Sequence, residues 1–227
     1  MYSKETLQKV MKKAAALKEK YAAMNPAKIA LCVSTGNKKI GRVMNVSLMP
    51  IMTCANCSGC SKLCYDIKAC LQYVNVIDAR IRNTVLLLKD RGAYFDRIEA
   101  KISRRRKNKF FRWHVAGDII DLDYFSRMVE IAHRHGDFIF WTYTKNYKVV
   151  NKYCRLYGKE NIPENLHVMF SEWRGMEMIN PYNFPEFRVV FKGEKKPAGF
   201  YCPGNCDVCK ANNTGCLAGM TTYCNEH

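Results

Sequence analysis

The stretch Phe-Ile-Phe-Trp-Thr-Tyr-Thr, residues 138–144, decides the fold class of this chain. It is apolar enough to predict a strand that is covered on both faces, which is the environment of a strand inside a parallel sheet. Segments with apolar residues at three- and four-residue steps flank it, at residues 124–135 and 148–158, and this periodicity indicates helices. Helix, buried strand and helix in succession form the repeating unit of an α/β fold.

The same alternation extends in both directions along the chain. We predict helices at residues 3–24, 70–89 and 93–105, and strands at residues 29–34, 43–49, 110–115, 166–171 and 187–191. Strands that alternate with helices indicate parallel pairing through right-handed crossovers. The sequence therefore predicts an α/β fold, built as a partial (β/α) barrel or as an open parallel sheet.

The alternation of strands and helices stops near residue 192, after which Gly, Pro and Cys dominate. We therefore predict two parts. Residues 1–195 form an α/β domain with an N-terminal helix and a cysteine loop at residues 54–70. Residues 196–227 form a cysteine-rich C-terminal tail whose structure a bound metal stabilises.

Cysteines are concentrated in two groups. The first has the spacing Cys-x2-Cys-x2-Cys-x3-Cys, which is that of bacterial ferredoxin-type iron–sulfur ligation, although Tyr65 stands where the ferredoxin run has proline. The second group lies in the tail and includes Cys-x3-Cys-x2-Cys. The predicted metal ligands are Cys54, Cys57, Cys60, Cys64, Cys202, Cys206, Cys209 and Cys216.

The spacing identifies candidate ligands more directly than it identifies the metal that they bind. Structural zinc favours paired Cys-x2-Cys knuckles separated by a spacer, whereas the first group places four cysteines within residues 54–64. We therefore expect one or two iron–sulfur clusters, of the 4Fe–4S type, with zinc as the alternative. The spacing leaves open which cysteines share a centre.

The N-terminal residues and the hydropathy of the chain indicate its cellular compartment. The N-terminal residues lack the apolar stretch of a secretory signal, and no run approaches 18 consecutive apolar residues. We therefore expect a cytoplasmic protein without a membrane span. In that compartment the 12 cysteines are thiols or metal ligands and not disulfides.

The formal net charge of +17 favours a polyanionic partner, and we predict nucleic acid or nucleotides. The densest basic run supplies the candidate contacts Arg104, Arg105, Arg106 and Lys107. The alternative interpretation is a generally basic surface whose lysines are solvated.

Polar residues follow successive predicted strands. Gly117 and Asp118 end one strand, Lys145 follows the next, and Glu172 follows the one after. Because the carboxyl ends of parallel strands meet at one edge of a sheet, we predict Asp118, Lys145 and Glu172 as catalytic residues beside the cysteine loop. Two alternatives stay open: Asp118 caps a helix, and Lys145 and Glu172 are solvated or form an ion pair. We interpret His114 as a hydrogen-bonded core residue.

Four segments taken in order resemble the bacteriophage gene product 88 family. They are residues 34–41, 50–65, 112–118 and 140–145, within an overlap of roughly residues 30–173 that is followed by a similar cysteine-rich tail. The resemblance implies a protein of a phage or mobile element.

A more distant likeness is to radical S-adenosylmethionine enzymes. In those enzymes a cysteine loop ending in Cys-Tyr follows the first strand, and the next strand ends in a glycine–acid motif. Cys64-Tyr65 and Gly117-Asp118 stand in similar positions here. The likeness implies that S-adenosylmethionine binds at Gly117 and Asp118, with Asp118 directed to its amino group. The order of cysteine spacings, two then three, is the reverse of that family's, and Cys54 adds a fourth thiol.

The sequence thus predicts an iron–sulfur protein, which the likeness extends to a radical S-adenosylmethionine-like enzyme acting on nucleic acid or nucleotides. The alternative is a non-enzymatic nucleic-acid-binding protein in which zinc holds both cysteine groups and the basic run contacts phosphates.

Overall fold

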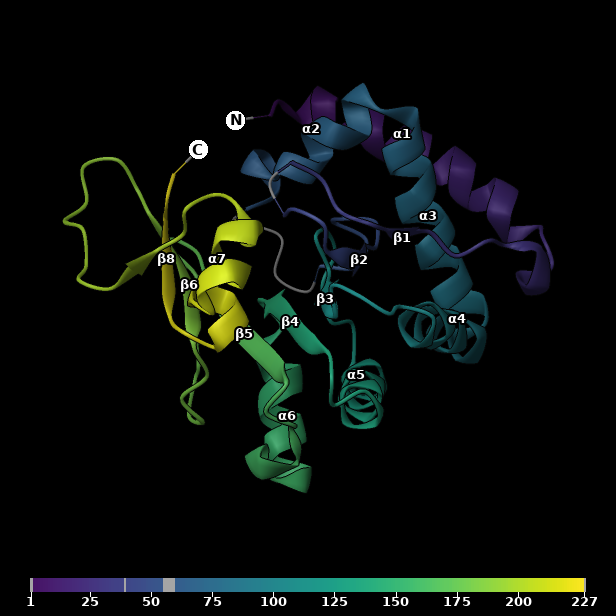
Figure 1. Ribbon diagram of the computed structural model, residues 1–227. Helices are drawn as coiled ribbons and strands as arrows, with labels where there is room; N and C mark the ends of the chain where they lie inside the picture. Colours follow the sequence, from purple (N-terminus) through teal and green to yellow (C-terminus); the bar gives the residue numbers. More distant parts are fainter. Residues whose placement is uncertain (1, 39, 55–59, 227) are drawn as a thin grey trace.

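The structure is a computed structural model that describes residues 2–38, 40–54 and 60–226. Over this range the chain forms one eight-stranded sheet with the strand order β1-β2-β3-β4-β5-β6-β8-β7 (Figure 1). The strands are β1 (Val33–Ser34), β2 (Met44–Val46), β3 (Phe110–Trp113), β4 (Ile139–Thr144), β5 (Leu166–Glu172), β6 (Glu186–Val190), β7 (Phe200–Tyr201) and β8 (Thr222–Asn225). The predicted α/β fold is confirmed, as an open and mostly parallel sheet.

Helices connect the strands. They are α1 (Lys4–Ala22), α2 (Tyr65–Gln72), α3 (Val74–Lys89), α4 (Arg91–Ser103), α5 (Leu122–Arg134), α6 (Tyr147–Tyr157) and α7 (Cys206–Asn212), with the short 3-10 helices η1 (Pro26–Lys28), η2 (Ser61–Leu63), η3 (Lys159–Asn161) and η4 (Gly215–Ala218). Strands β2 to β6 lie in chain order and pair in parallel, while β1 pairs with β2 in the antiparallel sense. None of the helices in the described part of the chain is long and apolar enough to cross a membrane.

Alternation along the strands divides the interior into two cores. In β4, Phe140 belongs to the large core that packs against α1 to α6, whereas its neighbour Trp141 belongs to a small core on the other face. Cys209 and Leu217, from α7 and η4, complete the small core. Figure 1 shows α7 across the sheet from α5 and α6. The prediction that residues 138–144 are covered on both faces is therefore confirmed.

Two predicted elements differ from the structure. The helix predicted at residues 70–89 is two helices, because Tyr73 has extended backbone angles and both ends α2 and begins α3. The strand predicted at residues 29–34 shortens to β1. The side chain of Asn83, on α3, takes both backbone groups of Cys32, accepting from its N–H and donating to its carbonyl at 2.8 Å each, so these groups are not available to a strand partner.

The cysteine-rich tail joins the sheet. Strand β8 pairs in parallel with both β6 and β7, and Cys202 N donates to Tyr223 O at 2.7 Å. Helix α7 and the η4 turn lie between these strands in the sequence and cover β4 and β5. The tail therefore adds both strands and a second layer to the fold, and its stapling by a metal stays a prediction.

Candidate functional site

The cysteine loop leaves the sheet at the carboxyl end of β2. After this strand, Leu48 N donates to Ala116 O at 2.9 Å, and Met49 N donates to Thr84 Oγ1 on α3 at 2.8 Å. These two hydrogen bonds fix Leu48 and Met49 before the chain reaches Cys54, which is half-buried. Cys57 lies outside the described residues. The chain returns through Cys60, η2 and Cys64 into α2.

Burial dominates the electrostatics of Cys54 and Cys64. Burial, with smaller contributions from the charges of Asp118, Cys64 and Cys60, raises the pKa of Cys54 to about 12. Burial also raises the pKa of Cys64, while the backbone amides of Asp66 and Ile67 lower it. Thiols in such surroundings are protonated near neutral pH, so a bound metal is needed to hold them as thiolates.

The ligand sets predicted at the two cysteine groups stay predictions. Across residues 2–38, 40–54 and 60–226, no three His, Cys, Asp or Glu side chains are placed as a group that could hold a metal ion. The loop set includes Cys57, which is not among these residues.

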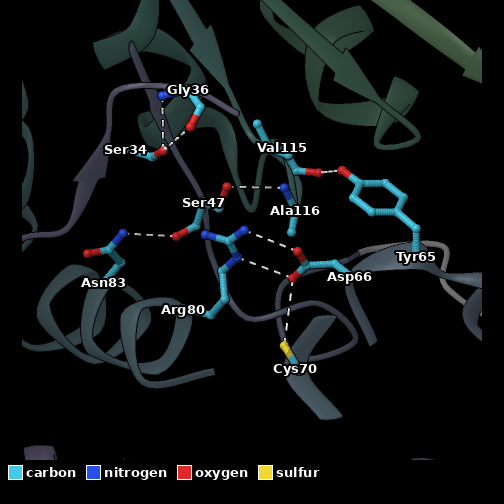
Figure 2. Close-up of polar contacts among 10 residues, drawn as sticks. All are labelled: Ser34, Gly36, Ser47, Tyr65, Asp66, Cys70, Arg80, Asn83, Val115 and Ala116. Carbon is cyan, nitrogen blue, oxygen red and sulfur yellow. Dashed lines mark hydrogen bonds and ion pairs between the residues drawn. The ribbon is translucent and has the colours of Figure 1, made fainter. Parts of the chain in front are cut away.

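The end of the cysteine loop is clamped to α3 and to the end of β3 (Figure 2). The hydroxyl of Tyr65 donates to the carbonyl of Val115. The buried carboxylate of Asp66 accepts from Arg80 Nε at 3.2 Å and from Arg80 Nη2 at 3.1 Å. Cys70 Sγ also donates to Asp66, at 3.8 Å. The fifth cysteine of the loop is therefore turned toward this ion pair.

A second contact ties the strands to α3 at the same place. Asn83 Nδ2 donates to Ser47 O at 3.0 Å, and Ser47 Oγ accepts from Ala116 N at 3.2 Å (Figure 2). Sequence reasoning missed Asn83 and the pair of Asp66 with Arg80. Asn83 is a polar residue among the buried apolar positions of α3. Such a residue is the one local signal in the sequence that points to a hydrogen bond between a helix and a strand.

Gly117 lies directly against the strand that leads into the loop. Its φ is +84°, and a Cβ there would lie 2.7 Å from Leu48 Cβ and 2.8 Å from Thr53 Oγ1. Only glycine combines this left-handed backbone with so close an approach. The predicted site residue Gly117 thus sets how closely the cysteine loop packs on the end of β3.

We expect Gly117→Ala to lower the free energy of unfolding by about 2 kcal/mol, because the left-handed backbone and the contact with Leu48 both penalise a Cβ. Urea unfolding followed by circular dichroism measures the change. Gly136→Ala is the matched control, since a Cβ at Gly136 meets nothing within 4 Å. Equal stability of the two variants would contradict the close packing described for Gly117.

Asp118 joins the carboxyl ends of two strands. Its Oδ1 accepts from Thr144 Oγ1 at 2.6 Å and from Ile119 N at 2.7 Å, and its Oδ2 accepts from Lys145 N at 2.9 Å. Burial raises the pKa of Asp118, and these hydrogen bonds oppose the rise. The residue that caps α5 is Asp121, so the interpretation of Asp118 as the helix cap is wrong.

Lys145 and Glu172 lie at the same edge of the sheet, after β4 and at the end of β5. Lys145 Nζ donates to Ser171 Oγ at 3.0 Å. Glu172 forms an ion pair with Arg188 of β6, whose Nη2 lies 3.1 Å from Glu172 Oε1. The hydroxyl of Tyr147 donates to the carbonyl of Ser171. The fold therefore brings the three predicted residues of this edge to successive strand ends, and their catalytic roles stay predictions.

His114 is a hydrogen-bonded core residue, as interpreted from the sequence. It is 3% exposed, and its Nε2 lies 2.8 Å from the hydroxyl of Tyr124. Its Nδ1 lies 3.4 Å from Thr142 Oγ1. Burial lowers the pKa of His114 to about 3, with a smaller contribution from Arg112.

This pKa predicts a pH dependence of stability. Below the unfolded-state pKa of about 6.5, the unfolded chain protonates His114 while the folded protein keeps it neutral. The unfolded state then binds more protons, so stability falls as the pH drops from about 6.5 toward 3, by about 1.4 kcal/mol per pH unit. His114→Asn removes this increment, and asparagine tolerates the φ of 55°. Urea unfolding at two pH values measures it, and equal pH dependence in both proteins would be the contrary result.

The cysteines of the tail gather around one small cavity. It measures about 20 Å³ and lies against Trp141 and Tyr143 of β4. Burial outweighs the opposing effect of the nearby guanidinium of Arg112 and raises the pKa of Cys206 to about 11. Arg112 itself stacks on Tyr143, with its Cζ 4.6 Å from the ring centroid. The predicted ligands that line this cavity are Cys202, Cys206, Cys209 and Cys216.

The basic run lies at the edge of the sheet opposite the cysteine loop. Arg104, Arg105, Arg106 and Lys107 follow α4 and precede β3, at the amino ends of the parallel strands. All of them except Arg105 are exposed. The cysteine loop lies at the carboxyl ends, so nucleic acid bound at this run would contact the opposite edge of the sheet.

Comparison with known proteins gives one relationship. No curated protein and no solved structure matches the chain. A family model described as Gene product 88 matches residues 7–226, from α1 through β8. This match takes in the N-terminal helix and the cysteine-rich tail as well as the four segments that pointed to the family. The chain therefore belongs to the gene product 88 family of phage proteins.

Proposed function

We propose that this protein holds an iron–sulfur cluster on the cysteine loop, with Cys54, Cys57, Cys60 and Cys64 as ligands. The observation that carries the proposal is that Cys54, Cys60 and Cys64 lie on one loop, which leaves β2 at the carboxyl edge of the sheet and returns through η2 into α2. An all-sulfur donor set suits iron–sulfur clusters, and the spacing of this loop is a ferredoxin-type spacing.

The surroundings of the loop support the same proposal. The backbone amides of Asp66 and Ile67 lie near Cys64, and such N–H groups stabilise and tune the sulfur ligands of a cluster. The chain is tethered to β3 and α3 before Cys54 and after Cys64, so the two ends of the loop are fixed. A cluster contributes reducing or oxidising equivalents at this edge, beside Asp118, Lys145 and Glu172.

Anaerobic purification tests this proposal. We expect a brown protein whose broad visible absorbance is bleached by dithionite. A colourless protein with stoichiometric zinc would contradict it and would support the alternative of a zinc-stabilised nucleic-acid-binding protein.

A second candidate is a radical S-adenosylmethionine-like enzyme acting on nucleic acid or nucleotides. The observation that favours it is that the cysteine loop and Gly117-Asp118 follow β2 and β3, which are adjacent and parallel. The test is formation of 5′-deoxyadenosine from S-adenosylmethionine under reducing conditions. Because four thiols would saturate the cluster, Cys54→Ala is assayed beside the natural protein. No product above the Cys60→Ser background in either protein would contradict this candidate.

A further inference from the structure

A groove of about 750 Å³ lies between α6 and the connection from β5 to β6, residues 173–185. One wall carries Lys148, Lys152 and Arg155, and the other carries Ile179, Pro181 and Tyr182. We propose that this groove binds single-stranded nucleic acid, with the phosphates on the cationic wall and the bases on the apolar wall. The proposal goes beyond the metal centre and does not depend on it.

The cationic wall is a regular row on one face of α6. Lys148, Lys152 and Arg155 are exposed and follow one another at four- and three-residue steps. At 1.5 Å per residue the row is about 10 Å long, so its three cations can contact neighbouring phosphates of one strand. Within the described residues none of the three cations forms an ion pair. With Glu177 as the carboxylate of the lining, the groove keeps a net positive charge.

The apolar wall is held in place opposite this row. Asn151 Nδ2 on α6 donates to Ile179 O at 2.8 Å, and Lys159 Nζ donates to Tyr182 O at 2.6 Å. Ile179 is 54% exposed, although it is a large apolar side chain. A positively charged groove with an aromatic platform is the arrangement by which proteins bind single strands, whose unstacked bases can reach such a wall. Bases paired inside a double helix cannot.

The groove begins at the edge of the sheet that carries the candidate site. Tyr147, the first residue of α6, lines the groove, and its hydroxyl donates to the carbonyl of Ser171. Lys145 Nζ binds the hydroxyl of the same serine. A single-stranded nucleic acid in the groove therefore lies beside the sheet edge that holds Asp118 and the cysteine loop. The basic run of residues 104–107 lies at the opposite edge.

Fluorescence anisotropy with the full-length protein and a labelled oligothymidylate of about twelve nucleotides tests the proposal. Three triple variants each remove three positive charges from a different place: Lys148→Gln/Lys152→Gln/Arg155→Gln in the groove, Arg104→Gln/Arg106→Gln/Lys107→Gln in the basic run, and Lys9→Gln/Lys12→Gln/Lys13→Gln on α1. All nine side chains are exposed, so the variants should fold, which circular dichroism checks.

We expect the groove triple to bind at least tenfold more weakly and to reduce the salt slope of the binding constant by about 2, the value for three phosphate contacts on a single strand. The α1 triple should stay within about twofold of the natural protein. A groove triple that binds no more weakly than the α1 triple would overturn the proposal. So would a loss that only the basic-run triple shows.

A variant of the apolar wall separates nucleic acid from a general anion. Tyr182→Ala should weaken binding of the oligothymidylate several-fold while leaving the salt slope unchanged, because it removes a base contact and no phosphate contact. Tyr182→Phe should keep the affinity. If Tyr182→Ala binds normally and inorganic polyphosphate competes as well as the oligothymidylate does, the groove is a general anion site and the proposal is wrong.

Discussion

Replacing Cys60 or Cys64 with serine should remove the visible absorbance of the anaerobically purified protein and most of the iron bound at the cysteine loop. Both residues lie where the loop returns to the sheet edge, and both act electrostatically on Cys54. A hydroxyl is a poor replacement for a thiolate on a cluster, so loss of one ligand should cost the whole centre. Iron analysis and visible spectra of the purified variants measure the effect.

Two buried cysteines serve as controls for this experiment. Cys70 lies six residues beyond Cys64, but its thiol is turned to Asp66. Cys154 lies on α6 within the large core. Cys70→Ala and Cys154→Ala should therefore keep the full iron content. If Cys70→Ala loses iron as Cys60→Ser does, the ligand set assigned to the loop is wrong.

Replacing Asp66 with asparagine should lower the free energy of unfolding by about 3 kcal/mol, because it leaves a buried guanidinium without its counter-charge. The Asp66 side chain is 3% exposed and that of Arg80 is 15% exposed. Burial on its own lowers the pKa of Arg80, and the carboxylate of Asp66 more than offsets this effect. Urea unfolding of the metal-free protein isolates the stability change from any change in metal binding.

Glu99→Gln is the matched control for Asp66→Asn. Glu99 also accepts two hydrogen bonds from one arginine, at 2.7 and 2.8 Å from Arg134, but the Glu99 side chain is 25% exposed and that of Arg134 is 52% exposed. Its loss should cost less than about 1 kcal/mol. The double variant Asp66→Asn/Arg80→Met should be less destabilised than the sum of its single variants, since it leaves no unpaired charge. Strict additivity would show that the pair is not coupled.

The pair of Asp66 and Arg80 also shows where sequence reasoning stops. In one continuous helix these residues would lie about 21 Å apart along the axis, at 1.5 Å per residue. The break at Tyr73 turns α2 back on α3, so the carboxylate meets the guanidinium. No helix-breaking residue marks residue 73 in the sequence, and the break depends on tertiary packing. The ion pair that fixes the end of the cysteine loop could therefore not be predicted from the local sequence.

The arrangement of the sheet edge was predictable for a physical reason. Parallel strands place their carboxyl ends together, and this rule put Asp118, Lys145 and Glu172 on neighbouring strand ends. The partners of these residues were not predictable, because they come from other strands: Thr144 for Asp118 and Arg188 for Glu172.

The secondary structure of the cysteine-rich tail was also not predictable from its local sequence. Its Gly-, Pro- and Cys-rich sequence has no strand or helix periodicity, yet β7 and β8 extend the sheet and α7 closes the second core. Short strands of this kind form because neighbouring chain offers paired backbone groups, and not because their own side chains favour them. The groove beside α6 also went unpredicted, since it needs the position of the connection from β5 to β6.

The content of iron, acid-labile sulfide and zinc per chain of the anaerobically purified protein tests directly whether the cysteine loop holds a cluster. We predict iron and sulfide in equal amounts, about four of each for a cluster on the cysteine loop, and their joint loss in Cys60→Ser. Zinc at one or two ions per chain, with no labile sulfide, would contradict an iron–sulfur cluster on this loop and leave both cysteine groups structural.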